Sequence, residues 1–147
     1  MTATSHAIVG TVIAAKVGNP ALAIPIALAS HVILDAIPHW DTITNGNAKN
    51  AQKLINTIID FAVSLILSWV ILVLLFPQTS IYYAFFIIIV AQLFDWLTMP
   101  YKFFGIKPFF IWIYKFQKLF DRKLDKPWGI ITQVATIIAI LIIAKLV

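Results

Sequence analysis

Residues 57–76 read TIIDFAVSLILSWVILVLLF, a run of twenty residues in which Asp60 is the only charged side chain. About 20 mostly apolar residues in a helix cross the hydrocarbon layer of a membrane. Pro77 follows directly, and proline disfavours continuation of a helix. This segment therefore predicts a transmembrane helix and indicates the fold class of the whole chain.

Apolar segments on both sides extend this pattern. Three further segments are long enough to predict membrane spans, namely 21–37, 81–99 and 130–147. Residues 5–17 are also apolar, but at about 1.5 Å per residue they are too short to cross about 30 Å of hydrocarbon unaided. We expect them to form a short first helix packed against the second. The sequence thus predicts an all-α integral membrane bundle of four or five transmembrane helices, with residues 1–147 as a single domain.

The composition excludes most soluble classes of protein. The 147 residues are 61% hydrophobic and 12% charged, with a mean hydropathy of +0.94. Soluble domains are about 45–50% apolar and about 25% charged. A water-soluble globular enzyme and a disordered chain are therefore both excluded. The absence of cysteine excludes disulfides and thiolate zinc sites.

The distribution of basic residues predicts the orientation in the membrane. Lys49 and Lys53 lie between 21–37 and 57–76, and seven basic residues lie between 81–99 and 130–147, whereas the connection between 57–76 and 81–99 carries no charge. Connections rich in lysine and arginine stay in the cytoplasm. We therefore expect a multi-pass protein of the inner (cytoplasmic) membrane.

Residues 106–126 combine a basic side with an apolar side. At 100° per residue, five basic residues fall together: Lys107, Lys115, Lys118, Arg122 and Lys126. Phe109, Phe116 and Phe120 fall on the other side. This pattern predicts an amphipathic helix on the membrane surface, with anionic lipid headgroups as partners. A basic connection that only fixes orientation explains the lysines equally well. No nucleic-acid partner is expected.

Ionisable side chains gather at one end of the predicted helices. Six of them lie near the helix ends that the orientation places at the cytoplasmic face: His6, His31, Asp35, His39, Asp60 and Asp95. Such groups are costly inside a membrane and usually face the interior of a bundle. Because successive helices alternate in direction, we expect these side chains to meet in one layer near the inner leaflet.

These side chains are suited to binding a divalent metal ion. His31 and Asp35 lie four residues apart on one helical face and could bind one ion together. Pro38 would bend the chain so that His39 and Asp41 approach from the following connection. Imidazole and carboxylate together suit Zn, Mn or Mg. A bound ion would make a coordinated water a nucleophile for hydrolysis.

The aspartates outside this pair have open roles. An uncoordinated Asp60 or Asp95 could act as general base. Asp60 could instead cap the helix over 57–76 or pair with a lysine, and Asp95 could pair with Lys102. Asp41 could be a turn or capping residue.

Two short motifs resemble a known family. Residues 30–41 read SHVILDAIPHWD and contain the pattern H-x-x-x-D-x-x-P-H-x-D. This resembles the core motif of the bacterial inner-membrane metal-dependent hydrolases. The family also has an earlier Thr/Ser-His step followed by a small-residue helix, to which Ser5-His6 with Gly10 is similar. The His-x-x-x-Asp pair is similar, more weakly, to part of the motif set of zinc-dependent phospholipases C.

The resemblance implies a hydrolase with a divalent metal, Zn or else Mn or Mg. The implied ligands are His6, His31, Asp35 and His39. The placement of the predicted helices adds three candidate catalytic carboxylates, Asp41, Asp60 and Asp95. The nearby basic segment favours a phospholipid or another phosphoester as substrate. No histidine follows His39, so the later histidine run of many longer members is missing and a second metal is not implied.

Two other functions stay open. Buried aspartates and histidines also form ion or proton relays, so a small ion- or proton-coupled transporter is one alternative. The outer halves of the predicted helices nearly lack ionisable groups, which disfavours a path across the membrane. The other alternative is a non-catalytic membrane protein whose polar layer holds its helices together.

Overall fold

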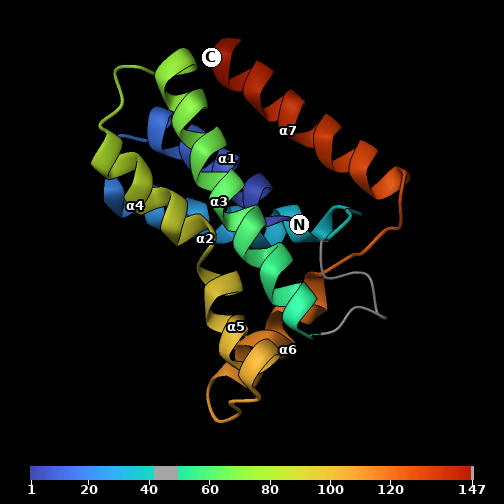
Figure 1. The fold of residues 1–147 in the computed structure, drawn as a ribbon. Coiled ribbons are helices and arrows are strands. Elements are labelled where there is room, and N and C mark those ends of the chain that lie inside the picture. Colours follow the sequence, from blue (N-terminus) through green and yellow to red (C-terminus); the bar gives the residue numbers. More distant parts are fainter. Residues whose placement is uncertain (42–49, 147) are drawn as a thin grey trace.

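The chain folds into helices that cross one another at several angles (Figure 1). A computed structural model describes residues 1–41 and 50–146, and these residues form seven helices and no strand. The helices in chain order are α1 (Ala3–Lys16), α2 (Pro20–Ala36), α3 (Asn50–Leu75), α4 (Ile81–Ala91), α5 (Leu93–Phe104), α6 (Phe110–Phe120) and α7 (Trp128–Leu146). The predicted all-α class is confirmed.

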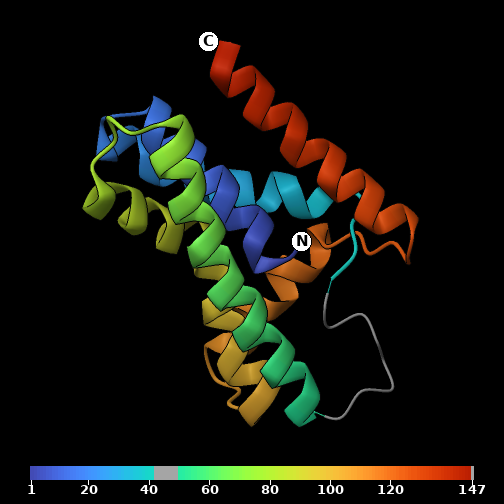
Figure 2. The same ribbon diagram turned by 45° about the horizontal axis from the view of Figure 1, so that its top comes forward.

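The short helix α1 lies inside the bundle. It packs against α3 and α4, and it also contacts α2 and α7 (Figures 1 and 2). Ala7 and Thr11 are fully buried, and most of the helix is enclosed by protein. The prediction of a short first helix packed against the second is confirmed, with α3 and α4 completing its surroundings.

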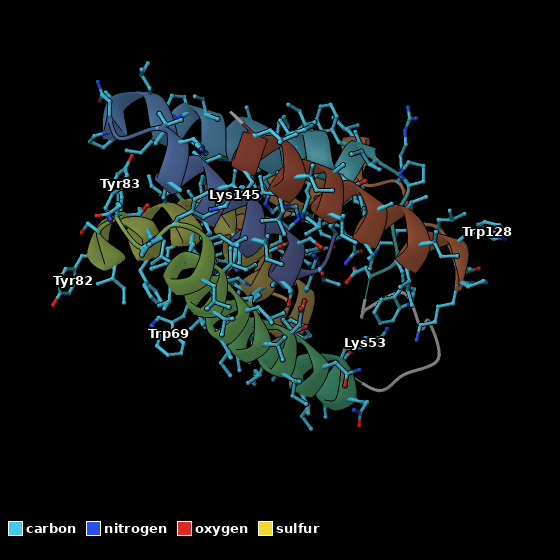
Figure 3. The ribbon with its side chains drawn as sticks, turned by 90° about the horizontal axis from the view of Figure 1, so that it is seen from above. Lys53, Trp69, Tyr82, Tyr83, Trp128 and Lys145 are labelled. Carbon is cyan, nitrogen blue, oxygen red and sulfur yellow. The ribbon has the colours of Figure 1, made fainter. Side chains whose placement is uncertain are left out.

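Two helices of the described residues, α3 and α7, are long and apolar enough to cross a membrane. A third span results if the bent pair α4 and α5 crosses as one. Large side chains such as Trp69, Tyr82 and Trp128 project outward (Figure 3), and each is about half exposed or more. Exposed apolar surface on this scale is typical of contact with lipid. α2 has 17 residues, and its crossing stays a prediction.

The predicted span over 81–99 is broken in the structure. α4 and α5 meet at Gln92 with a bend of 48°. The Gln92 amide Nε2 donates to Ser64 Oγ (3.0 Å) and to the Ala3 carbonyl (3.1 Å). The amide therefore lies inside the bundle between α1 and α3, which explains a polar residue within this apolar run.

The helix continues past residue 99, where the predicted segment 81–99 ends, and through Pro100. Pro100 lies within α5, which continues to Phe104 and ends at Gly105. Gly105 has a φ of 68°, the left-handed conformation that glycine favours at helix ends. Its amide donates to the Tyr101 carbonyl (3.1 Å), and Ile106 N donates to the Pro100 carbonyl (3.2 Å). These bonds satisfy carbonyls at the end of the helix.

The predicted surface helix over 106–126 is confined to α6. After α6 the backbone pairs with the segment that follows α2: His39 N donates to the Arg122 carbonyl (3.0 Å), and Leu124 N donates to the His39 carbonyl (2.7 Å). This pairing includes a parallel bridge between His39 and Lys123. Because Arg122 N and Leu124 N donate to the Asp35 and His39 carbonyls, they do not extend α6, and Asp121 comes to lie beside His39.

Candidate metal centre

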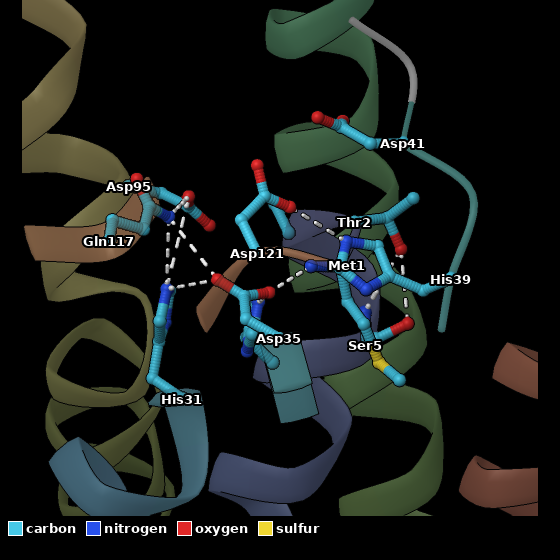
Figure 4. A network of polar contacts seen from close by, with 12 residues as sticks. Met1, Thr2, Ser5, His31, Asp35, His39, Asp41, Asp95, Gln117 and Asp121 are labelled. Carbon is cyan, nitrogen blue, oxygen red and sulfur yellow. Dashed lines mark hydrogen bonds and ion pairs between the residues drawn. The ribbon is translucent and has the colours of Figure 1, made fainter. Parts of the chain in front are cut away.

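Polar ends of several helices meet at one place in the bundle (Figure 4). His6 comes from α1, His31 and Asp35 come from α2, and Asp95 comes from the first turn of α5. His6, His31 and Asp35 are each at most 2% exposed. Four of the six side chains expected to meet thus lie together.

A hydrogen bond to the backbone fixes the orientation of His31. Its Nδ1 lies 2.7 Å from the carbonyl oxygen of Ala91, the last residue of α4. A carbonyl only accepts, so Nδ1 carries the proton and donates. In the neutral ring, Nε2 then has a free lone pair, and it lies 3.4 Å from Asp35 Oδ2 and 4.0 Å from Asp95 Oδ1. A backbone bond of this kind commonly orients a metal-binding histidine.

His6 is stacked on His31 and is buried without a full set of partners. The two ring centroids lie 3.8 Å apart, with 10° between the ring planes. His6 Nε2 lies 3.2 Å from Asp35 Oδ1, but neither ring nitrogen makes a well-formed hydrogen bond within the described residues. Buried polar atoms normally have partners. These atoms of His6 therefore fit a site that receives a further group.

Three side chains offer donor atoms to a common point. One ligand atom each from His6, His31 and Asp95 can be chosen so that all three lie within 4.8 Å of one another. Two imidazoles and a carboxylate could together hold a metal ion. Asp35 of α2 contacts both histidines, with one carboxylate oxygen 3.2 Å from His6 Nε2 and the other 3.4 Å from His31 Nε2. The Met1 backbone nitrogen also contacts Asp35 Oδ1.

Gln117 of α6 reaches into the same group. Its Nε2 lies 2.9 Å from Asp95 Oδ1, 3.4 Å from Asp35 Oδ2 and 3.3 Å from His31 Nε2. The amide thus occupies the position between these three acceptors. We did not predict this residue from the sequence. The available signal is its position four residues after Ile113, which places an amide on the apolar side of the helix.

The structure places His39 away from the group of His6, His31 and Asp95. His39 Nδ1 lies 2.8 Å from the Ile37 carbonyl, and Nε2 lies 3.3 Å from Asp121 Oδ1. Beside this pair, Lys123 Nζ lies 2.8 Å from Asp41 Oδ2. Asp121 is a second residue that the sequence did not indicate, because its contact depends on the backbone pairing after α6.

Charges near His39 shift two pKa values outside the helices. Burial acts to raise the pKa of Asp121, but its contact with His39 and the charge of Lys123 hold this pKa below the usual range. Burial acts to lower the pKa of Lys123, but the Asp41 carboxylate raises it above the usual value. Both groups therefore stay charged at neutral pH.

Asp60 of α3 supports the start of α1. Its carboxylate accepts hydrogen bonds from Ala3 N (2.7 Å), Thr4 N (3.3 Å) and Thr4 Oγ1 (2.6 Å). The first backbone amides of a helix lack partners within it, and a carboxylate satisfies them well. Asp60 therefore caps α1 rather than its own helix, and it holds the end of α1 near His6.

A cavity of about 50 Å³ lies beside these residues, but His6, His31 and His39 are not part of its lining. Its lining includes one lysine, Lys102, and five aspartates: Asp35, Asp41, Asp60, Asp95 and Asp121. A space of this size holds a few water-sized groups. All three candidate catalytic carboxylates thus face one acidic cavity, whereas only Asp95 also belongs to the group that could hold a metal ion.

Comparisons with protein families, with characterised proteins and with solved structures give no match to this chain. The interpretation of the site therefore depends on its own residues and geometry.

Proposed function

We propose that this chain is a membrane-bound, metal-dependent hydrolase that cleaves a phosphoester, such as that of a phospholipid. The observation that carries the proposal is the group of His6, His31 and Asp95, whose donor atoms lie within 4.8 Å of one another. The resemblance of residues 30–41 to the bacterial inner-membrane metal-dependent hydrolases supports the same function. We place the site at the cytoplasmic face of the inner membrane.

In this proposal His6, His31 and Asp95 hold a divalent ion, either Zn or else Mn or Mg, and Asp35 contacts both histidines. When bound, such an ion lowers the pKa of a coordinated water and so supplies a nucleophile. The Ala91 carbonyl keeps His31 in the required orientation.

Other carboxylates of the acidic cavity would handle protons. Asp41 and Asp60 line this cavity and lie outside the group that could hold the ion. A general base needs to be near the attacking water, directly or through one further water. Asp41 and Asp60 are therefore the candidates for accepting the proton of the attacking water.

Recovery of hydrolysis when metal is restored to the metal-depleted protein tests the proposal. The purified protein, in nonionic detergent, is treated with a chelator and resupplied with Zn, Mn or Mg. Release of nitrophenol from bis(p-nitrophenyl) phosphate and cleavage of a short-chain phosphatidylglycerol are then measured. We expect activity to return with at least one of the ions. Asp95→Asn should lower it at least about tenfold, because it weakens the ligand group.

Asp125→Asn is the matched control, since Asp125 is exposed and lines neither cavity. Its activity should equal that of the wild type. Activity that ignores the metal, or equal losses in Asp95→Asn and Asp125→Asn, would contradict the proposal. No cleavage of either substrate with any of the three ions would favour a structural role for the polar layer.

A further inference from the structure

A second cavity, of opposite charge, adjoins the acidic cavity. It has a volume of about 230 Å³ and lies between the start of α3, the end of α5, α6 and the segment after α6. Its charged lining consists of four lysines and one aspartate, a net charge of +3: Lys53, Lys102, Lys118, Lys123 and Asp121. We call this space the lysine cavity.

Shared partners hold three of the ammonium groups close together. Lys102 Nζ and Lys118 Nζ each lie 5.9 Å from the centre of the Tyr114 ring. Lys118 Nζ and Lys123 Nζ lie 3.9 Å and 3.8 Å from the same oxygen, Asp121 Oδ2. One carboxylate cannot neutralise several ammonium groups. Like charges held in this way attract an anion strongly.

Apart from Lys123, the lysines of this cavity lack a close acidic partner within the described residues. Lys123 forms its short ion pair with Asp41 (2.8 Å). Within the described residues, Lys53 and Lys102 form no ion pair, and the contact of Lys118 with Asp121 is long. Lysines from three different helices thus keep positive charge available toward one space. Ammonium groups are common binding groups for phosphate.

The two cavities are connected by common walls. Lys102, Phe103, Gln117 and Asp121 line both of them. Gln117 is also the side chain that contacts His31 and Asp95. A ligand in the lysine cavity would therefore lie beside Gln117, which contacts the candidate metal centre.

The acidic cavity offers an apolar wall for the rest of such a ligand. Phe61, Trp96 and Met99 line it together with Phe103. The two adjoining cavities thus offer basic groups on one side and apolar side chains on the other, as expected for binding an amphiphile. We propose that the lysine cavity binds the phosphoryl group of an anionic phosphoester, with Lys53, Lys102 and Lys118 as its main binding residues. The part of this inference that directs the bound phosphoester toward the candidate metal centre rests on the proposed function.

Binding without metal tests this inference separately from catalysis. The full chain in nonionic detergent with excess chelator is titrated with dihexanoyl phosphatidic acid, and binding is followed by calorimetry. Lys102→Gln/Lys118→Gln should bind at least about tenfold more weakly, since two charge-assisted contacts are lost. Lys102→Arg/Lys118→Arg keeps the charge and should keep most of the affinity.

The control removes the same charge elsewhere. Lys16 and Lys145 both lie over the Phe76 ring and line neither cavity. Lys16→Gln/Lys145→Gln should bind as the wild type does. Equal losses in the two double glutamine variants, or equal binding of dihexanoyl phosphatidylcholine, would overturn the inference.

Binding of methyl phosphate distinguishes a lipid from a soluble phosphoester as the source of the phosphoryl group. Weaker binding of methyl phosphate than of the lipid supports an amphiphile, whereas equal binding assigns the lysine cavity to soluble phosphoesters. If the protein binds phosphatidic acid in the presence of chelator but shows no hydrolysis, the lysine cavity is supported and the proposed hydrolase function is rejected. If hydrolysis depends on metal but Lys102→Gln/Lys118→Gln binds the lipid as the wild type does, only the role of the lysine cavity is rejected.

Discussion

At the scale of single residues, the orientation of His31 depends on a break in another helix. α4 ends at Ala91, and the last carbonyls of a helix have no partner within it. The Ala91 carbonyl is therefore free to accept from His31 Nδ1 (2.7 Å). Gln92, at the break, ties the junction to Ser64 and Ala3. One interruption of an apolar segment thus positions a histidine on a different helix.

Gln117 provides a prediction at this scale. Its amide donates to His31 and Asp95 where a cation would bind, so it would compete with a metal ion for these donor atoms. We expect Gln117→Leu to bind Zn about fivefold more tightly, because the metal-free protein loses a hydrogen bond worth about 1 kcal/mol. Competition with a coloured chelator measures the affinity.

Gln52→Leu is the control for this prediction. Gln52 is an exposed residue on α3 that bonds only to Asn56 within the described residues, so its replacement should leave the Zn affinity unchanged. Weaker Zn binding by Gln117→Leu would contradict the competition and would make the Gln117 side chain a ligand.

The sequence predicted which residue types meet, but not the finer selection among them. Positions near the cytoplasmic helix ends indicated that His6, His31 and Asp95 would lie in one layer. They did not indicate that His39 faces Asp121 instead. That difference depends on hydrogen bonds between the backbones of residues 39–40 and 122–129. Such pairing of irregular segments leaves no periodic signal.

At the scale of helices, close packing of α1 on α4 holds the site together. A Cβ atom at Gly10 would lie 2.9 Å from Ala91 Cβ and 3.1 Å from Ile88 Cα. Small residues allow helix backbones to approach closely in membrane bundles. Gly10 therefore sets the distance between the helix that carries His6 and the carbonyl that orients His31.

Gly10→Ala should destabilise the protein by about 1–3 kcal/mol, because the added methyl group would clash with α4 unless the two helices move apart. The melting temperature in detergent should fall accordingly. Gly18→Ala is the matched control, since a Cβ atom there meets nothing within 4 Å. Equal melting temperatures for the two variants would contradict close packing of α1 on α4 at Gly10.

Helix lengths were more predictable than helix interruptions. The hydropathy of residues 57–76 and 130–147 indicated the long helices α3 and α7, and the short run 5–17 indicated a short first helix. The bend at Gln92 could not be predicted, because the partners of its amide come from α1 and α3. The sequence also did not predict that α5 continues beyond residue 99 and through Pro100.

At the scale of the whole molecule, polar side chains are buried within an apolar core, and the outer surface is also apolar. All three histidines are buried, as are apolar residues such as Ile87 and Ile88, while α3 exposes large apolar residues such as Ile66 and Leu74. Two cavities of opposite charge adjoin each other at the polar side of this interior. This arrangement joins a candidate metal centre to a candidate anion site within one small bundle.

The metal content of the purified protein tests the central claim most directly. The wild type, supplied with Zn and Mn and then freed of loosely bound ions, should retain roughly one ion per chain by mass spectrometry. His6→Ala/His31→Ala should retain none while keeping its helical circular dichroism, and His39→Ala should retain the ion. A wild type without stoichiometric metal, or a double variant that keeps it, would contradict a metal centre formed by His6, His31 and Asp95.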